Sequence, residues 1–241
     1  MYQAALWGGI ASLSLFLGAL MGIYLKIPKK ITAFIMAFGT GLIIGSATFD
    51  LLSEAKGNAD ILQITAMFLF GAGIFTLFEL WISKKGGSQR KRSKKNPHNH
   101  SGLAIYTGTL MDAIPESIII GVSFLGSQSV QWVFIAAIFI SNFPEALSSS
   151  IGLKLDNYSP KKILTLWGSV VIISSLSALA GYIFLRNAPE STEFIIGAFG
   201  AGGLLAMVSS TMLPEAFEEG GPVVGFISSL GIIISYIFTN L

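Results

Sequence analysis

Long apolar stretches alternate with short polar ones along the whole chain. Each stretch is about 20 residues long, the length that a helix needs to cross a hydrocarbon core of about 30 Å. The stretches lack the period-two alternation of a β-barrel, so they predict transmembrane helices. We expect eight of them, at about residues 4–25, 31–53, 61–82, 102–125, 130–153, 161–185, 193–217 and 221–240.

The composition agrees with an all-α integral membrane protein that forms one domain over residues 1–241. Hydrophobic residues make up 52% of the chain and charged residues 12%, and the mean hydropathy is +0.70. That leaves too little polar surface for a soluble globule of this length. Seven of the fifteen basic residues lie in one loop, which is not the charge pattern of a nucleic-acid binder. The chain has no cysteine, so disulfides and thiolate metal sites are excluded.

The basic residues predict how the helices are oriented. If the N-terminus lies outside, thirteen of the fifteen Lys and Arg fall in cytoplasmic loops, as the positive-inside rule requires. We therefore expect a multi-pass protein of the cell (inner) membrane with both termini extracytoplasmic. Residues 83–101 then form a basic cytoplasmic loop, whose two histidines, His98 and His100, either handle metal or are simply solvated.

Two distant parts of the chain share a sequence pattern. Ala37–Gly41 recurs as Ala198–Gly202, and at the same offset Leu52–Ala55 recurs as Leu213–Ala216. With eight spans, the two segments cross the membrane in opposite directions, so the pattern predicts three helices, a central pair and three inverted helices. Inverted repeats around a midplane site are typical of transporters. Recurring glycines alone can also serve close helix packing.

The central pair of segments holds acidic residues deep inside apolar sequence. Asp112 and Glu116 are one turn apart and share a face of the fourth segment, and Ser141 and Glu145 do the same in the fifth. A proline directly precedes each glutamate and frees a backbone carbonyl. Carboxylates in the middle of a membrane cost about 2.5 to 3.5 kcal/mol each and usually mark an ion pathway.

No basic residue lies within the helix interiors to neutralise these acids. A divalent metal ion would supply the charge, because carboxylate, amide and carbonyl oxygens are suitable ligands for it. Protonated acids that are hydrogen-bonded to neighbouring serines are the alternative. Further acids are predicted at the two mouths of a path, with Asp50 and Glu54 at the outer entrance and Glu215 and Glu218 at the inner exit.

Eight helices, a basic loop after the third and Pro-Glu motifs in the fourth and fifth resemble the ZIP family of divalent metal transporters. In that family the fourth helix carries His-Asn-x-Pro-Glu-Gly and the fifth His-x-x-Pro-Glu-Gly. The matching stretches here are Asp112–Ser117 (DAIPES) and Ser141–Ala146 (SNFPEA), and Leu213–Ala216 (LPEA) is also similar. The resemblance implies a metal site formed by Asp112, Glu116, Ser141, Asn142 and Glu145.

The resemblance also implies uptake by alternating access, an elevator-like movement of the central helices, a homodimer and no prosthetic group. Because Asp112 and Ser141 replace the family histidines, the preference for zinc is weakened, and manganese, iron(II), cobalt or even magnesium become credible cargo. An enzyme is not expected, since no histidine lies in a helix. The alternatives are a metal sensor of the same fold that does not conduct, or a proton-coupled carrier of another small cation.

Overall fold

The computed structural model is helical throughout and describes residues 2–56, 59–84, 101–125 and 132–240. The side chains of residues 54, 82–84, 101–105 and 190 lie outside that description, as do His98 and His100 and most of the predicted basic loop. In chain order the elements are α1 (Tyr2–Tyr24), α2 (Lys29–Gly45), the π-helix η1 (Ser46–Leu52), α3 (Ser53–Ala55), α4 (Ile61–Lys84), α5 (Ser101–Val122), α6 (Trp132–Leu155), α7 (Pro160–Leu185), α8 (Glu190–Met207), the π-helix η3 (Val208–Met212), α9 (Leu213–Gly220) and α10 (Val223–Thr239).

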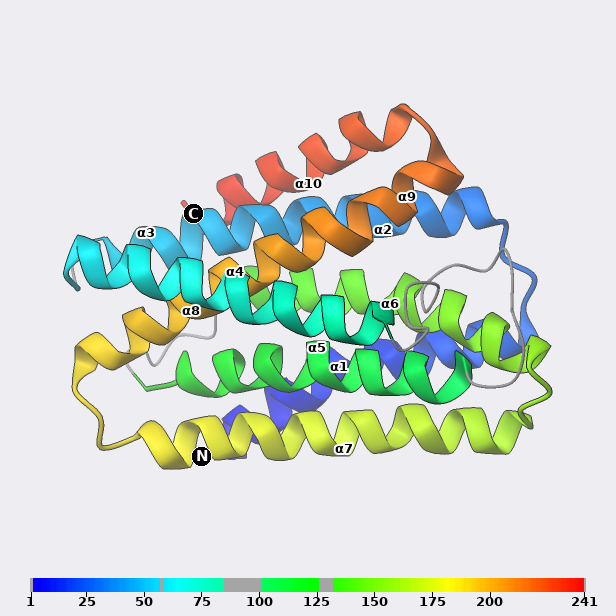
Figure 1. Ribbon diagram of the computed structural model, residues 1–241, viewed down its shortest axis with the longest axis horizontal. Helices are drawn as coiled ribbons and strands as arrows, with labels where there is room; N and C mark the ends of the chain where they lie inside the picture. The colour runs from blue at the N-terminus through cyan, green and yellow to red at the C-terminus, as the bar shows by residue number, and fades with distance from the viewer. Residues whose placement is uncertain (1, 57–58, 85–100, 126–131, 241) are drawn as a thin grey trace.

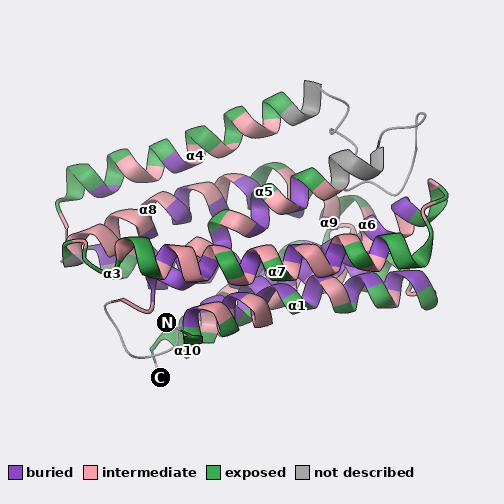
Figure 2. Cartoon of the chain, turned by 90° about the horizontal axis from the view of Figure 1, so that it is seen from below, coloured by how far each residue is buried: buried purple, intermediate pink, exposed green. Residues whose placement is uncertain are grey.

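All eight predicted segments are helical, and their ends lie within a few residues of those expected. Among the described residues, six helices are long and apolar enough to cross a membrane by length and composition, and α10 is apolar but shorter. Apolar side chains are exposed along α4, among them Leu62, Leu69 and Leu77 (Figure 2). Such a surface suits lipid contact, so the chain is a multi-pass helical membrane protein.

Successive long helices run in alternating directions, and both termini lie toward the same end of the molecule (Figure 1). At the opposite end, Lys154 at the end of α6 donates a 2.8 Å hydrogen bond from Nζ to the carbonyl of Ile23 in α1. Lys29, which begins α2, lies 3.4 Å from Oε1 of Glu219 in α9. Lys29 and Lys154, two of the lysines that the positive-inside rule assigns to the cytoplasmic side, therefore lie at one end of the bundle.

The helices pack in two groups. One consists of α1, α5, α6 and α7, and the other of α2, α4, α8 and α10 with η1. Trp167 of α7, Leu15 of α1 and Leu153 of α6 are fully buried together in the first group. The main contact between the groups joins α2 to α6. The central pair α5 and α6 thus belongs to the first group, which contacts the second group mainly through the packing of α6 on α2.

The recurring glycines lie at helix contacts that mirror one another. Gly39 of α2 lies against α6, whereas Gly200 of α8 lies against α5. Gly41 of α2 lies against α10, and Gly202 of α8 lies against α4. The two π-helices η1 and η3 also interrupt their helices at matching positions of the repeat. The glycines therefore serve close packing within the chain, since an added Cβ would meet backbone or side-chain atoms of the neighbouring helix.

Candidate metal site

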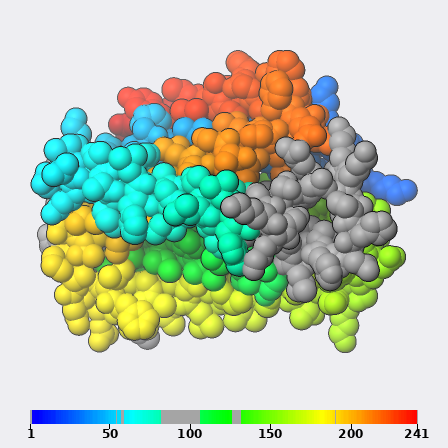
Figure 3. Space-filling view, in the orientation of Figure 1, coloured from blue at the N-terminus to red at the C-terminus, as the bar shows by residue number. Residues whose placement is uncertain are grey.

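Asp112 and Glu116 lie one turn apart on α5 and are buried, with 6% and 4% of their surface exposed. Both line one cavity of about 150 Å³ between α4, α5 and α8, whose other walls are mostly apolar. On the face shown in Figure 3, α5 is visible as a green strip between α4 and α7. The helix continues through Pro115 without a break. The two carboxylates therefore face the same space, as their spacing predicts.

The neighbouring helix α6 contributes Ser141, Asn142 and Glu145, all of them buried. Thr109 of α5 donates a 3.3 Å hydrogen bond from Oγ1 to Oε1 of Glu145, which joins the two helices. The hydroxyl of Ser141 donates to the carbonyl of Ile138 in its own helix at 3.0 Å. Within the described residues, Nδ2 of Asn142 has no hydrogen-bond partner. The α6 residues thus offer carboxylate, amide and hydroxyl oxygens in a buried position.

The predicted ligands are brought together only in part. In the part of the chain that the structure describes, no three Asp, Glu, His or Cys side chains gather closely enough to hold a metal ion. Asp112 and Glu116 share a cavity, while Glu145 meets α5 one turn earlier, at Thr109. The ligand set of Asp112, Glu116, Ser141, Asn142 and Glu145 therefore stays a prediction.

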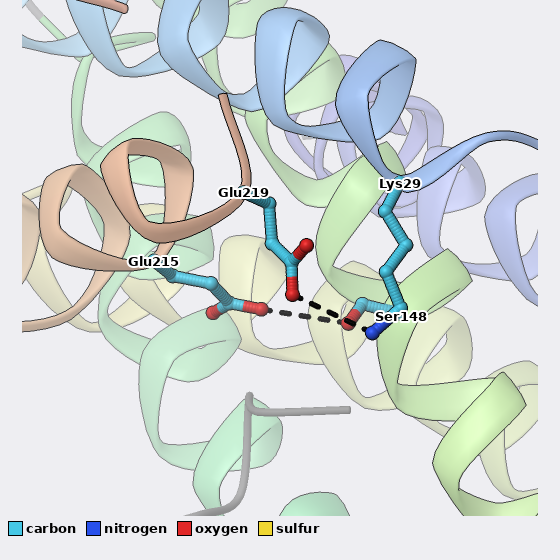
Figure 4. Close-up of polar contacts among 4 residues, drawn as sticks. All are labelled: Lys29, Ser148, Glu215 and Glu219. Atoms are coloured by element: carbon cyan, nitrogen blue, oxygen red, sulfur yellow. Dashed lines mark hydrogen bonds and ion pairs between the residues drawn. The ribbon is translucent and has the colours of Figure 1, made fainter. Parts of the chain in front are cut away.

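The predicted exit acids lie on α9 beside the start of α2 and the second half of α6. Oε1 of Glu215 accepts a 3.4 Å hydrogen bond from Oγ of Ser148 in α6, and Oε1 of Glu219 pairs with Lys29 (Figure 4). Glu218 is exposed. Glu215 thus links α6, which carries Glu145, to α9, which packs against α2. Glu218 lies at the surface at the same end of the molecule.

The predicted entrance acids are placed less regularly than the sequence suggests. Asp50 lies in η1, so the segment that we predicted as an ordinary helix is π-helical, and the four-residue spacing from Asp50 to Glu54 no longer corresponds to one α-helical turn. Oδ1 of Asp50 accepts a 2.6 Å hydrogen bond from Oγ1 of Thr239 in α10. Beside this contact, the hydroxyls of Ser46 and Ser235 lie 3.3 Å apart. Asp50 thus contacts Thr239 of α10 and Ser46 of its own segment, and the side chain of Glu54 lies outside the described residues.

Comparison with known proteins gives one informative relative. No protein-family model matches the chain. The chain resembles a named plant protein. Over 209 residues it is 25% identical to the Arabidopsis thaliana protein "Putative zinc transporter At3g08650". The alignment covers 86% of the chain and 33% of the relative, so the chain spans about a third of that protein's length. The relative's name agrees with the class of protein that the Pro-Glu motifs suggest.

Replacing Asp50 by alanine is expected to lower the melting temperature in detergent, because Thr239 loses a buried acceptor. One such hydrogen bond contributes about 1 kcal/mol, which corresponds to roughly 2 to 4 °C for a chain of this size. Asp50→Asn keeps an oxygen that can accept from Thr239 and should melt within about 1 °C of the unaltered protein. Equal melting temperatures for the alanine and asparagine variants would contradict an anchoring role.

Two polar residues near the candidate site have partners that the sequence did not indicate. Thr109 precedes Asp112 by three positions and Glu116 by seven, so a helical stripe of polar residues on α5 could have indicated it. Ser148 lies one turn after Glu145 on α6, in a run of three serines that gives no reason to prefer one of them. Their partners, Glu145 and Glu215, come from other helices, so only the folded chain identifies the contacts.

Proposed function

We propose that this protein carries a divalent metal ion across a membrane, bound between α5 and α6. The observation that carries the proposal is the burial of Asp112, Glu116 and Glu145 in a stretch, residues 101–153, that contains no Lys, Arg or His. Charged carboxylates in such a place need a cation. The similarity to a protein named for zinc transport supports the same conclusion.

The ligands of the transported ion are the side-chain oxygens of Asp112, Glu116, Ser141, Asn142 and Glu145. Since Asp112 and Glu116 line one cavity while Glu145 meets α5 at Thr109, binding requires side chains from both helices to turn toward one ion. A set of oxygens without imidazole favours hard or borderline ions, so zinc, manganese, iron(II) and cobalt are the candidates. Protons compete with the metal for these carboxylates, so binding weakens as the pH falls.

Transport occurs by alternating access of two related halves. The glycines of α2 contact α6 and α10, and the corresponding glycines of α8 contact α5 and α4. These contacts and the two π-helices support an inverted repeat of the first three and last three membrane segments around α5 and α6. The grouping of α1, α5, α6 and α7 supports an elevator-like movement of that unit against α2, α4, α8 and α10. The proposal includes a homodimer, which only the resemblance to the ZIP family suggests.

The direction of transport is uptake into the cytoplasm through the cell (inner) membrane. The end with Lys29 and Lys154 faces the cytoplasm by the positive-inside rule, and both termini then lie outside. On this orientation the ion leaves past Glu215 and Glu218, and Asp50 and Glu54 lie at the outer end, where negative charge draws cations.

Uptake of a metal panel into proteoliposomes tests the proposal. Zinc, manganese, iron(II), cobalt and magnesium are offered one at a time to vesicles that contain a metal-sensitive dye, with protein-free vesicles as the control. At least one transition metal is expected to enter in a saturable manner that slows as the pH falls. Saturable metal binding in detergent without uptake would instead identify a sensor, and neither binding nor uptake would overturn metal handling altogether.

A further inference from the structure

The central pair makes two seams with the repeated helices, α6 with α2 and α5 with α8, and these differ in how closely they are packed. At the α2–α6 seam, a Cβ placed on Gly39 would lie 2.8 Å from the backbone N and Cα of Ser141, so two backbones touch. At the equivalent α5–α8 seam, Gly200 meets only the side chain of Ile119. The first seam is closed by main-chain contact, whereas the second is held apart by one apolar side chain. At the second seam the space between the two backbones is therefore filled by a side chain, which can change its rotamer, and not by main chain.

Three cavities follow one another along the α5–α8 seam. An outer cavity of about 170 Å³ lies at the ends of α7 and α8 and is lined by Arg186, Thr192 and Glu193. A second cavity of about 20 Å³ is lined by Glu193 again, with Ser123 and Ile119. The cavity that holds Asp112 and Glu116 is also lined by Ile119. Glu193 is thus shared by the first two cavities and Ile119 by the last two.

The sizes and linings of these spaces suit a hydrated cation that loses water as it moves inward. The outer cavity has room for several water molecules, and the second for about one. Glu193 provides a carboxylate where the two meet, and the buried hydroxyl of Ser123 provides a further oxygen. Arg186 is exposed at the outer rim and carries the same sign of charge as the cation, so attraction in the outer cavity comes from Glu193. Ile119 is 5% exposed and forms an apolar barrier before Glu116.

We infer that the α5–α8 seam is the route by which the ion travels between the outer end and the carboxylates of α5, with Glu193 as a ligand at its neck and Ile119 as its plug. The inference rests on the proposed function and adds to it a residue and a route that neither the motifs nor the repeat indicates. Leu51, the neighbour of Asp50, lines the second cavity, whereas Asp50 itself contacts Thr239 of α10.

The absence of cysteine from the chain allows a direct test of the route. Ser123→Cys is expected to react with silver ion added from the side of the termini, because a bare ion fits a cavity with room for about one water molecule whereas a larger thiol reagent does not. Zinc or manganese should slow that reaction several-fold. Ser174→Cys is the matched control, because Ser174 is fully buried on α7 and should react far more slowly. Equal rates at the two positions would overturn the route, whether or not the protein transports metal.

The role of Glu193 is tested by uptake kinetics. Glu193→Gln is expected to raise the KM for metal at the outer side about tenfold with the maximal rate within about twofold, because the ligand at the neck is lost while the central site is kept. Metal binding to the detergent-solubilised variant should be unchanged. Asp60→Asn serves as the control, since Asp60 is exposed and its first-turn contact with the backbone of Leu62 suits asparagine equally well.

An unchanged KM in Glu193→Gln, in a protein whose unaltered form transports metal, would overturn the assignment and leave the proposed function standing. Failure of the unaltered protein to transport any metal would instead count against the proposed function, and the thiol reaction at position 123 would still report on the route.

Discussion

Replacing Glu116 by glutamine is expected to reduce metal uptake on the order of 100-fold, because one negative charge leaves the ligand set while the side-chain volume is kept. Glu116 is 4% exposed and shares its cavity with Asp112, so solvent screening does not compensate for the lost charge. Glu145→Gln should act similarly. Its amide oxygen can still accept the hydrogen bond from Thr109, so the contact between α5 and α6 should survive.

The measurement is initial uptake into proteoliposomes, paired with calorimetric metal binding to the purified variants. Asp60→Asn, which removes an exposed carboxylate, is the control and should behave as the unaltered protein does. A loss of uptake with normal melting temperature and weakened binding would assign the carboxylates to the ligand set. Normal uptake in both Glu116→Gln and Glu145→Gln would refute that assignment. Among the described residues, Asp112 is the one remaining buried acid on α5 and α6.

A large effect on stability is expected from a methyl group at the contact between α4 and α8. A Cβ on Gly71 would collide with the backbone carbonyl of Phe199, and one on Gly202 with that of Phe68. Because both neighbours are backbone, neither can give way without moving a helix. Gly71→Ala and Gly202→Ala should each destabilise the protein by about 2 to 3 kcal/mol, which is roughly 5 to 10 °C in melting temperature.

Gly73 provides a control on the same helix. It lies two positions from Gly71, but nothing lies within 4 Å of a Cβ placed there. Gly73→Ala should therefore leave the melting temperature unchanged or raise it slightly, because alanine favours a helix over glycine by up to about 1 kcal/mol. Thermal unfolding in one detergent compares the variants. If Gly71→Ala melted no lower than Gly73→Ala, α4 and α8 would not be in backbone contact.

The helices and their approximate ends could be predicted because each apolar run must satisfy its own backbone hydrogen bonds in lipid. The buried acids Asp112, Glu116 and Glu145 could also be predicted, since so few charges occur in the chain. The π-helices could not, because a shift of one residue in hydrogen bonding leaves the hydrophobic pattern of 31–53 unaltered.

Contacts between helices that are distant in the sequence could not be predicted either. The partner of Asp50 is Thr239, near the end of the chain, and no local spacing relates the two. Glu193 opens the last but one membrane segment and looks like an ordinary residue at a helix end; only the cavities that it shares with α5 distinguish it. The sequence therefore indicated the acids at the centre of the site but not the surfaces that lead to them.

The matched π-helices have a consequence for the history of the chain. A π-helical turn holds one more residue per hydrogen bond than an α-helical turn. Here η3 falls within the stretch that corresponds to η1 when the two Ala-Phe-Gly motifs are aligned. If the halves descend from one duplicated segment, the extra residue was already present in the ancestor before the duplication. A single three-helix unit that associated with an inverted copy of itself would then have carried the distortion on both sides of the membrane at once.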